Sequence, residues 1–213
     1  MFKNLIASLT LTLLVPVAAF AQEWVEGENY DLIIPPMHTE DSDKIEVTEF
    51  FWYGCGHCYN FEPLVTQWKK TLPDDVKAVS SPAVWNKPME MHARAFYAAQ
   101  VLGVLDTMHP ALFQAMNVDR KRLSSDDEIK AIFVANGVSG DDFDKAYNSF
   151  GVSSQARQAN ARARTAKITG TPEMAVAGKY RISTAKAGGQ ANMLKVASFL
   201  IEKERTERVS KAE

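Results

Sequence analysis

The sequence predicts an α/β fold in which an all-helical domain interrupts a sheet-containing domain. A β-branched and aromatic run precedes the chain's only two cysteines, and a helical pattern follows them. About 60 residues then carry helical patterns without strand-like alternation, and a strand hairpin followed by an amphipathic helix comes last. A chain of 213 residues can bury a core of this kind in one domain carrying an insertion.

The first predicted strand leads through a tight turn into a helix. Residues 44–53 are rich in β-branched and aromatic side chains, and Gly54 frees the backbone for a sharp turn. Apolar residues then recur at helical spacing, at Phe61, Leu64, Val65, Trp68 and Leu72, before Pro73 ends the helix. Cys55 is therefore expected at the N-terminus of a helix.

The remaining elements follow from local patterns. Helices are predicted at 89–104, at 107–116, from the Ser125-x-x-Glu128 capping box to Asn136-Gly137, and from a cap within 139–142. A solvated connecting helix is predicted at 153–167, a strand hairpin at 173–182 around Ala177-Gly178, and an amphipathic helix at 192–208 with Met193, Val196, Phe199 and Leu200 on one side.

The first 21 residues predict export. A positive charge at Lys3, an apolar stretch over 5–17 and a small-x-small motif ending at Ala21 are typical of a secretory signal peptide cleaved after Ala21. A retained membrane anchor is the alternative, but the apolar core is shorter than the ~20 residues that a span needs. Cleavage leaves 192 residues and, with Lys3 lost, a formal net charge of −3 instead of −2. This balance gives no strong field for nucleic acid.

The two cysteines, Cys55 and Cys58, carry most of the functional information. A zinc site needs further Cys or His ligands at finger-like spacing, but the nearest downstream histidine, His92, lies 34 residues after Cys58. A purely structural disulfide would close a very short loop and gain little stability. A pair of inert buried thiols is the third alternative. We therefore predict a redox-active pair with no bound metal, held as a disulfide in an oxidising compartment.

The position of Cys55 favours its thiolate. Unpaired N–H groups and the positive end of the helix dipole stabilise an anion at a helix N-terminus, and His57 adds a cationic or hydrogen-bonding group within a turn. A low thiolate pKa stabilises the reduced pair and makes the disulfide a stronger oxidant.

Two further positions attract attention on weaker grounds. Thr171-Pro172 stands at the start of the predicted hairpin, where proline is ordinarily an edge residue with a trans peptide bond. Glu49 is an acid within the apolar strand, and pattern alone favours its exposure to solvent.

Taken together, these motifs resemble the DsbA family of bacterial periplasmic thiol:disulfide oxidoreductases. The resemblance covers essentially the whole mature chain and rests on Glu49-Phe50-Phe51, on Cys55-Gly56-His57-Cys58-Tyr59 with Phe61-Glu62, and on Thr171-Pro172 ahead of Gly178-Lys179-Tyr180. It implies a thioredoxin fold with an inserted all-helical domain. The implied boundaries are a signal peptide at 1–21, a thioredoxin-like domain in two parts at 22–87 and 161–213, and the helical domain at 88–160.

The resemblance also implies roles for individual residues. Cys55 would be the exposed nucleophile, Cys58 its buried resolving partner, and His57 a stabiliser of the Cys55 thiolate. Thr171-Pro172 would form a cis-proline loop beside the disulfide, with the Thr171 backbone pairing with a substrate strand. Glu49 would be a buried acid that assists proton transfer at Cys58. Pro63 would match a helix-kinking proline of thioredoxins.

The implied function is a periplasmic dithiol oxidase. It would pass its disulfide to unfolded exported proteins with free cysteines, and a quinone-linked membrane oxidase of the DsbB type would reoxidise it, with no organic cofactor or metal. Gly56 and Thr171 stand where the best-known enterobacterial members have proline and valine, and both residues also occur in disulfide isomerases. A reductase or isomerase therefore stays an alternative, as does a non-catalytic peptide-binding chaperone. Only about 20 residues separate the cleavage site from the first predicted strand, which favours a monomer.

Overall fold

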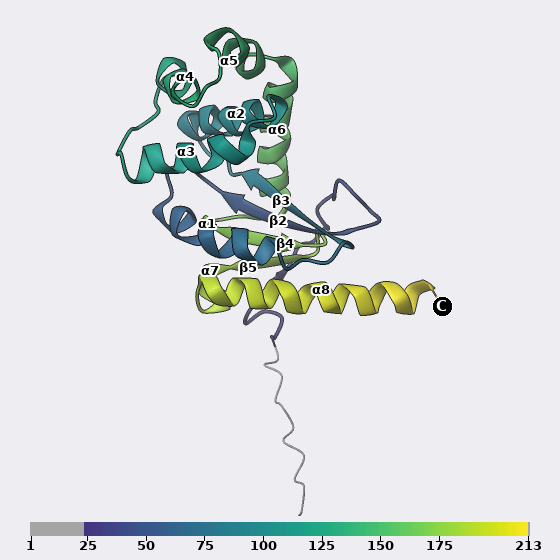
Figure 1. Cartoon of the computed structure of the whole chain (residues 1–213). Helices are drawn as coiled ribbons and strands as arrows, with labels where there is room; N and C mark the ends of the chain where they lie inside the picture. Colours follow the sequence, from purple (N-terminus) through teal and green to yellow (C-terminus); the bar gives the residue numbers. More distant parts are fainter. Residues whose placement is uncertain (1–23, 213) are drawn as a thin grey trace, which may run out of the picture.

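The computed structural model describes residues 24–212, so the predicted signal peptide lies outside the described residues. A five-stranded sheet occupies the middle of the molecule (Figure 1). Its strands are β1 (Asp31–Leu32), β2 (Ile45–Phe51), β3 (Val76–Pro82), β4 (Glu173–Val176) and β5 (Tyr180–Ser183). The helices are α1 (Gly56–Lys69), α2 (Lys87–Val101), α3 (Leu105–Asn117), α4 (Asp126–Ala135), α5 (Gly140–Tyr147), α6 (Phe150–Thr165), α7 (Thr184–Ala187) and α8 (Gln190–Ala212).

The sheet topology brings two distant segments to one edge. The strand order is β1-β5-β4-β2-β3, with β2 parallel to β3 and antiparallel to β4. Phe50 near the end of β2 pairs with Glu173 at the start of β4. The residues that follow β2 therefore lie beside the residues that precede β4, although more than 100 positions separate them in the chain.

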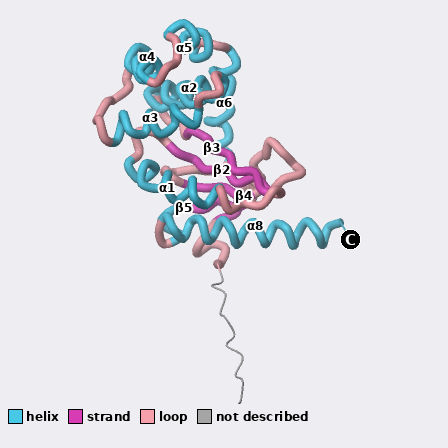
Figure 2. The backbone as a smooth tube through the Cα atoms, in the orientation of Figure 1, coloured by secondary structure: helices cyan, strands magenta, loops and turns pink. Residues whose placement is uncertain are grey.

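The two faces of β2 pack against different helices because side chains alternate along a strand. Ile45 and Val47 share a buried cluster with residues of α1 and α8, and Phe50 shares another with Ala163 and Ala166 at the end of α6. Figure 2 shows the strands enclosed in this way, with α8 running along the side of the sheet opposite the helical block. All seven residues of β2 are buried.

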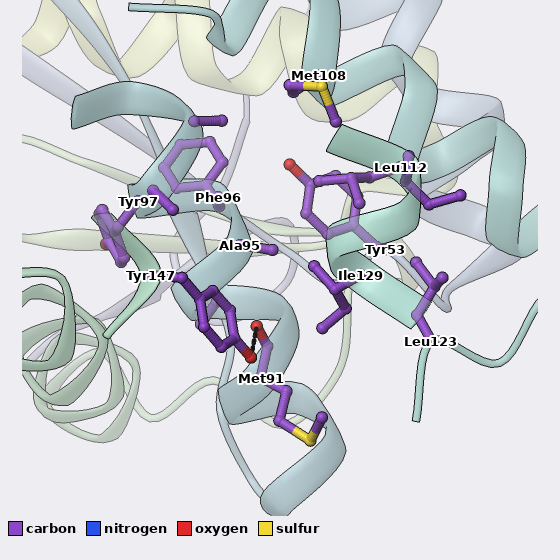
Figure 3. Close-up of a cluster of buried hydrophobic side chains, with 14 of the residues drawn as sticks. Tyr53, Met91, Ala95, Phe96, Tyr97, Met108, Leu112, Leu123, Ile129 and Tyr147 are labelled. Atoms are coloured by element: carbon purple, nitrogen blue, oxygen red, sulfur yellow. Dashed lines mark hydrogen bonds between the residues drawn. The ribbon is translucent and has the colours of Figure 1, made fainter. Parts of the chain in front are cut away.

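The helices α2 to α6 form a block with an apolar core of its own. Its largest fully buried side chains include Phe113, Phe133, Phe143 and Tyr147. Figure 3 shows Tyr53, from the turn after β2, packed into this core near Leu112 and Ile129. Side chains of Asn86, Ser125, Ser139 and Ser149 cap four of these helices, which confirms the cap predicted at Ser125 and the one predicted within 139–142. The block is thus a folded unit that also covers the end of β2.

Two strands escaped the sequence analysis. β3 is an edge strand with several polar residues and a terminal proline, and β1 has only two residues. Both lack the alternating apolar pattern from which a strand is inferred. β1 also places a strand within the segment that was expected to precede the first one.

The prediction of a solvated connecting helix at 153–167 was wrong about the environment of that helix. One face of α6 is buried, with Val152, Ala156, Ala159 and Ala163 spaced at four, three and four residues. Small side chains give only a weak hydrophobic signal, but they let α6 pack closely against α2. α6 also continues past residue 160, and the domain boundaries at 88 and 160 stay a prediction.

Candidate active site

The two cysteines occupy different environments at the start of α1. Cys55 is the N-cap residue and is half-buried, and its Sγ accepts a hydrogen bond from the Cys58 N–H at 3.4 Å. Cys58 lies in the first turn of the helix and is fully buried. Both are free thiols in this structure. A helix N-terminus therefore points its N–H groups at Cys55, as the sequence predicted, while Cys58 faces the core.

These environments drive the two thiol pKa values apart. A hydrogen bond with the Cys58 thiol, another with Thr171 and the N–H groups of Cys58 and His57 outweigh burial and lower the pKa of Cys55 to about 5. Burial above all, and then the neighbouring Cys55, raise the pKa of Cys58 far above its usual range. At neutral pH Cys55 is therefore a thiolate and Cys58 a thiol, so Cys55 is the better nucleophile and the better leaving group.

Gly56 and His57, the two residues between the cysteines, are both exposed. The His57 side chain is exposed, and its backbone carbonyl accepts a hydrogen bond from Gln190 Nε2 at 2.6 Å. The His57 contact that lowers the Cys55 pKa is its backbone N–H, so the role expected of the imidazole stays a prediction. A Cβ on Gly56 would lie no closer than 3.8 Å to its nearest neighbour, the Asn117 side chain, so there is room for a side chain there.

Gly54 is required for a different reason from the one inferred from sequence. A Cβ at this position would approach the Trp52 ring to 2.4 Å. The glycine thus makes space for Trp52, whose carbonyl accepts a hydrogen bond from the Cys55 N–H at 3.0 Å. The Trp52 indole in turn donates to the buried His92 at 2.9 Å. This chain of contacts links the turn before Cys55 to α2.

The distant Thr171-Pro172 segment lies against Cys55. The peptide bond between Thr171 and Pro172 is cis, as the family resemblance implied. When Cys55 is protonated, its thiol donates a hydrogen bond to the Thr171 carbonyl, whose oxygen lies 3.2 Å from Sγ. These two residues meet across 116 positions of sequence because β2 and β4 are paired in the sheet.

Glu49 is buried, so the expectation from the family resemblance is confirmed and the expectation from strand alternation is wrong. Its side chain is 2% exposed because α1 covers this face of β2, with Lys69 Nζ 3.4 Å from Glu49 Oε2. Ser80 Oγ donates to the same oxygen at 3.4 Å. Burial raises the pKa of Glu49, and the positive charge of Lys69 offsets only part of this effect.

A second, partly buried network was not found from sequence. Tyr53 and His109 share a hydrogen bond of 2.8 Å between the phenol oxygen and Nδ1, and His109 Nε2 lies 3.4 Å from Glu62 Oε2. Glu62, Lys69 and His109 line a cavity of about 580 Å³ between α1 and α3. Glu62 carried a weak signal, since it follows the cysteine motif, but His109 carried none. The helical block thus supplies a titratable group close to α1.

Within residues 24–212 there is neither a cluster of metal ligands nor a helix that could span a membrane. This part of the chain holds no group of three or more His, Cys, Asp or Glu side chains arranged to bind a metal ion. None of its helices is both long enough and apolar enough to cross a membrane.

Comparison with known proteins gives consistent matches. A family model described as a DSBA-like thioredoxin domain matches residues 82–200. The thiol:disulfide interchange protein DsbA of Pseudomonas aeruginosa is 38% identical over 205 residues, which cover 95% of this chain and 97% of the relative. The protein of the same name from Bordetella pertussis is 38% identical over 210 residues, which cover 96% of this chain and 97% of the relative.

Solved structures agree with the sequence relatives. The crystal structure of Pseudomonas aeruginosa DsbA matches with a TM-score of 0.83 at 37% identity, covering 87% of this chain and 96% of that one. The oxidoreductase DsbA from Xylella fastidiosa matches with a TM-score of 0.80 at 30% identity, covering 85% of this chain and 98% of that one. The predicted thioredoxin fold is confirmed, and these matches favour neither the isomerase nor the chaperone alternative. The chain belongs to the DsbA family of thiol:disulfide interchange proteins, and it is an oxidoreductase.

Proposed function

We propose that Cys55 and Cys58 form the redox-active pair through which this protein oxidises the cysteines of newly exported proteins. The observation that carries the proposal is the asymmetry of the pair. Cys55 is half-buried with a pKa of about 5, and Cys58 is fully buried with a raised pKa. Only Cys55 is placed to form a bond with a second protein.

The reaction consists of two thiol–disulfide exchanges that start from the Cys55–Cys58 disulfide. A client thiolate attacks Cys55 Sγ, the disulfide breaks, and Cys58 leaves as a thiolate that takes up a proton. The client's second thiolate then attacks the client sulfur that is bonded to Cys55, a disulfide forms within the client, and Cys55 leaves as a thiolate. The client loses two electrons and gains a disulfide, and the enzyme gains both electrons as a dithiol. These steps need no organic cofactor or metal.

The low pKa of Cys55 gives the reaction its direction. At pH 7 the reduced pair gains the free energy of about two pK units, at most about 2.7 kcal/mol, and solvent around the half-exposed sulfur reduces this amount. The full amount corresponds to about 60 mV on a two-electron scale. A more stable reduced enzyme is a more oxidising disulfide, which supports the oxidase over the reductase.

Glu49 is proposed to exchange a proton with Cys58 during these steps. A carboxyl whose pKa is raised by burial holds its proton closer to neutral pH than an exposed acid does. Cys58 must gain a proton when the enzyme is reduced and lose it when the enzyme is reoxidised. The Thr171 backbone, held beside Cys55, is proposed to pair with the extended client chain.

The proposed setting follows from the family and from the N-terminal sequence. The protein is proposed to act as a monomer in the periplasm after cleavage at Ala21. A quinone-linked membrane oxidase of the DsbB type is proposed to restore its disulfide. No nucleic acid takes part.

Trapping of mixed disulfides tests the order of attack. When mixed with disulfide-bonded client proteins, the Cys58→Ala variant should accumulate mixed disulfides, because the Cys55 thiolate attacks a client disulfide and Cys58 is no longer present to displace the client from Cys55. The Cys55→Ala variant, in which only the buried thiol is left, should trap few clients. The measurement is non-reducing electrophoresis after acid quenching. Equal trapping by the two variants would show that Cys55 is not the dedicated nucleophile.

A further inference from the structure

A second buried acid lies next to the cis-proline, and the reaction described above does not use it. Glu173 is the first residue of β4, directly follows Pro172, and is 3% exposed. Its Oε1 accepts hydrogen bonds from the N–H of Thr169 at 3.3 Å, the N–H of Gly170 at 3.0 Å and the Thr169 hydroxyl at 3.2 Å. One carboxylate oxygen therefore closes the loop that leads into the cis peptide bond.

On its other side, the carboxylate faces the Arg181 guanidinium at ion-pair distance, without a hydrogen bond. Glu173 Oε2 lies 3.8 Å from Arg181 Nε, and the same guanidinium pairs with Asp31 Oδ2 at 3.0 Å. Arg181 also donates a hydrogen bond to the Lys167 carbonyl, just after α6. The loop is thus attached through Glu173 and Arg181 to β1 and to the end of the helical block.

This attachment bears directly on Thr171. Glu173 holds Gly170, which precedes Thr171, and the Thr184 hydroxyl donates to the carbonyl of Pro172, which follows it, at 3.2 Å. Between these two fixed points, the Thr171 carbonyl lies 3.2 Å from Cys55 Sγ. An apolar side chain at position 173 would fill the same buried space at a smaller desolvation cost, but it would leave two backbone N–H groups without their acceptor.

We propose that Glu173 is a positioning residue, whose carboxylate holds the loop of residues 169–172 so that Thr171 stays in contact with Cys55 and presents its backbone to the client chain. The inference rests on the proposed function of Cys55 as the nucleophile. Glu173 does not touch Cys55, but it controls the contact between Thr171 and Cys55.

The test compares three variants with a matched control. Glu173→Ala removes all three hydrogen bonds, and Glu173→Gln keeps an acceptor oxygen at the same length. Arg181→Met loosens the carboxylate but leaves the loop sequence unchanged. The control is Glu204→Ala on α8, because Glu204 is also a buried, paired acid, with Lys179 Nζ at 2.6 Å. It lies 14 residues, or about 21 Å of helix, beyond Gln190, whose side chain contacts His57.

The readouts are the Cys55 pKa, taken from the pH dependence of its alkylation, the equilibrium with glutathione, and kcat and KM for client oxidation. Glu173→Ala should raise the Cys55 pKa by about one unit, because the Thr171 side-chain hydrogen bond, which lowers this pKa, is weakened when the loop shifts. A rise of one pKa unit changes the equilibrium constant with glutathione about tenfold, which lowers the reduction potential by about 30 mV. KM should rise severalfold with a smaller effect on kcat. Arg181→Met should shift the pKa in the same direction by less, and Glu173→Gln should leave it within about 0.3 units.

The control separates positioning from general destabilisation. Glu204→Ala should lower Tm without moving the Cys55 pKa. A Cys55 pKa that stays at its wild-type value in Glu173→Ala, or in Arg181→Met if Glu173→Ala does not fold, would overturn the inference. Equal shifts in Glu173→Gln and Glu173→Ala would also overturn it, by showing that the charge and not the acceptor matters. A wild-type Cys55 pKa near 8.5 would instead overturn the proposed function.

Discussion

The sheet-containing unit and the helical block bury different kinds of side chain. Seven polar or charged side chains are described as buried, and six of them lie in the sheet-containing unit. These six are Glu46, Thr48, Glu49, Ser81, Glu173 and Glu204, whereas the helical block contributes only His92. Its core is otherwise built from apolar and aromatic residues.

The difference indicates that polar groups buried around the sheet determine the reactivity of the site. Buried carboxylates cost desolvation energy, and two of them, Glu49 and Glu173, lie on the two strands whose ends carry Cys55 and the cis-proline. The helical block reaches the site through Tyr53, which packs into its core, and through hydrogen bonds such as that from Asn117 Nδ2 to the Tyr53 carbonyl at 2.8 Å. We therefore expect core substitutions in the block to change stability, and polar substitutions around the sheet to change reactivity.

The largest expected effect is on stability, from a substitution in the helical core. Phe133 is fully buried, with its ring centroid 4.8 Å from that of Phe143. Phe133→Ala should lower the free energy of unfolding by about 3–5 kcal/mol, because it leaves a cavity in a closely packed core. Urea unfolding measures this loss.

The same variant should leave the redox equilibrium nearly unchanged. The glutathione equilibrium of Phe133→Ala should stay within about 10 mV of the wild type, because the groups that set the Cys55 pKa belong to Cys58, His57 and Thr171, and none of these residues lies on α4. A potential displaced by 30 mV would mean that the helical core and the active site are coupled, and the comparison between the two units would fail.

The next effects come from Glu49→Gln, which should change first the stability and then the reactivity of the protein. Burial raises the pKa of Glu49, so the folded state favours its protonated form. The stabilising effect of that proton is complete below the unfolded pKa of about 4.3 and is lost as pH rises through the folded value. Glutamine carries no charge, so the variant should be more stable than the wild type by about 1 kcal/mol at pH 7, with no such gain at pH 4.

Although Glu49→Gln should be more stable, it should react more slowly than the wild type. If Glu49 accepts the proton of Cys58 as proposed, removing its carboxyl should slow the reoxidation of Cys58 at least about tenfold in rapid-mixing experiments. Ser80→Ala serves as a control, because it removes a hydrogen bond to Glu49 Oε2 but keeps the carboxyl. Loss of stability in Glu49→Gln at pH 7 would show instead that the pair with Lys69 stabilises the fold.

The smallest effect concerns the pH dependence of the reduction potential. Reduction of the pair takes up two protons below the Cys55 pKa of about 5 but only one above it, because the pKa of Cys58 is raised. The potential should therefore fall by about 59 mV per pH unit below pH 5 and by about 30 mV per unit above it. Titration against glutathione or a dithiol locates the break, and a single break near pH 8.5 would contradict the asymmetry of the two thiols.

The sequence alone determined the parts of the molecule that depend on neighbouring residues. The structure confirms the strand predicted within 44–53, the N-cap position of Cys55, the cap at Ser125 and the hairpin at Ala177-Gly178. Each is specified within one turn or one strand, where the apolar period and the cap or turn residues act over a few positions. The family motifs added the cis bond at Pro172.

Tertiary structure decided which of these parts meet. The contact of Thr171 with Cys55, the burial of Glu49 beneath α1, the pairing of His109 with Glu62 and the anchoring of Glu173 by Arg181 all join residues far apart in the chain or hidden by another element. Strand alternation indicates that a side chain faces one side of a sheet, but not what covers that side. Burial, and with it the shift of each pKa, is set by the packing of whole elements, so the reactivity of Cys55 is a property of the assembled fold.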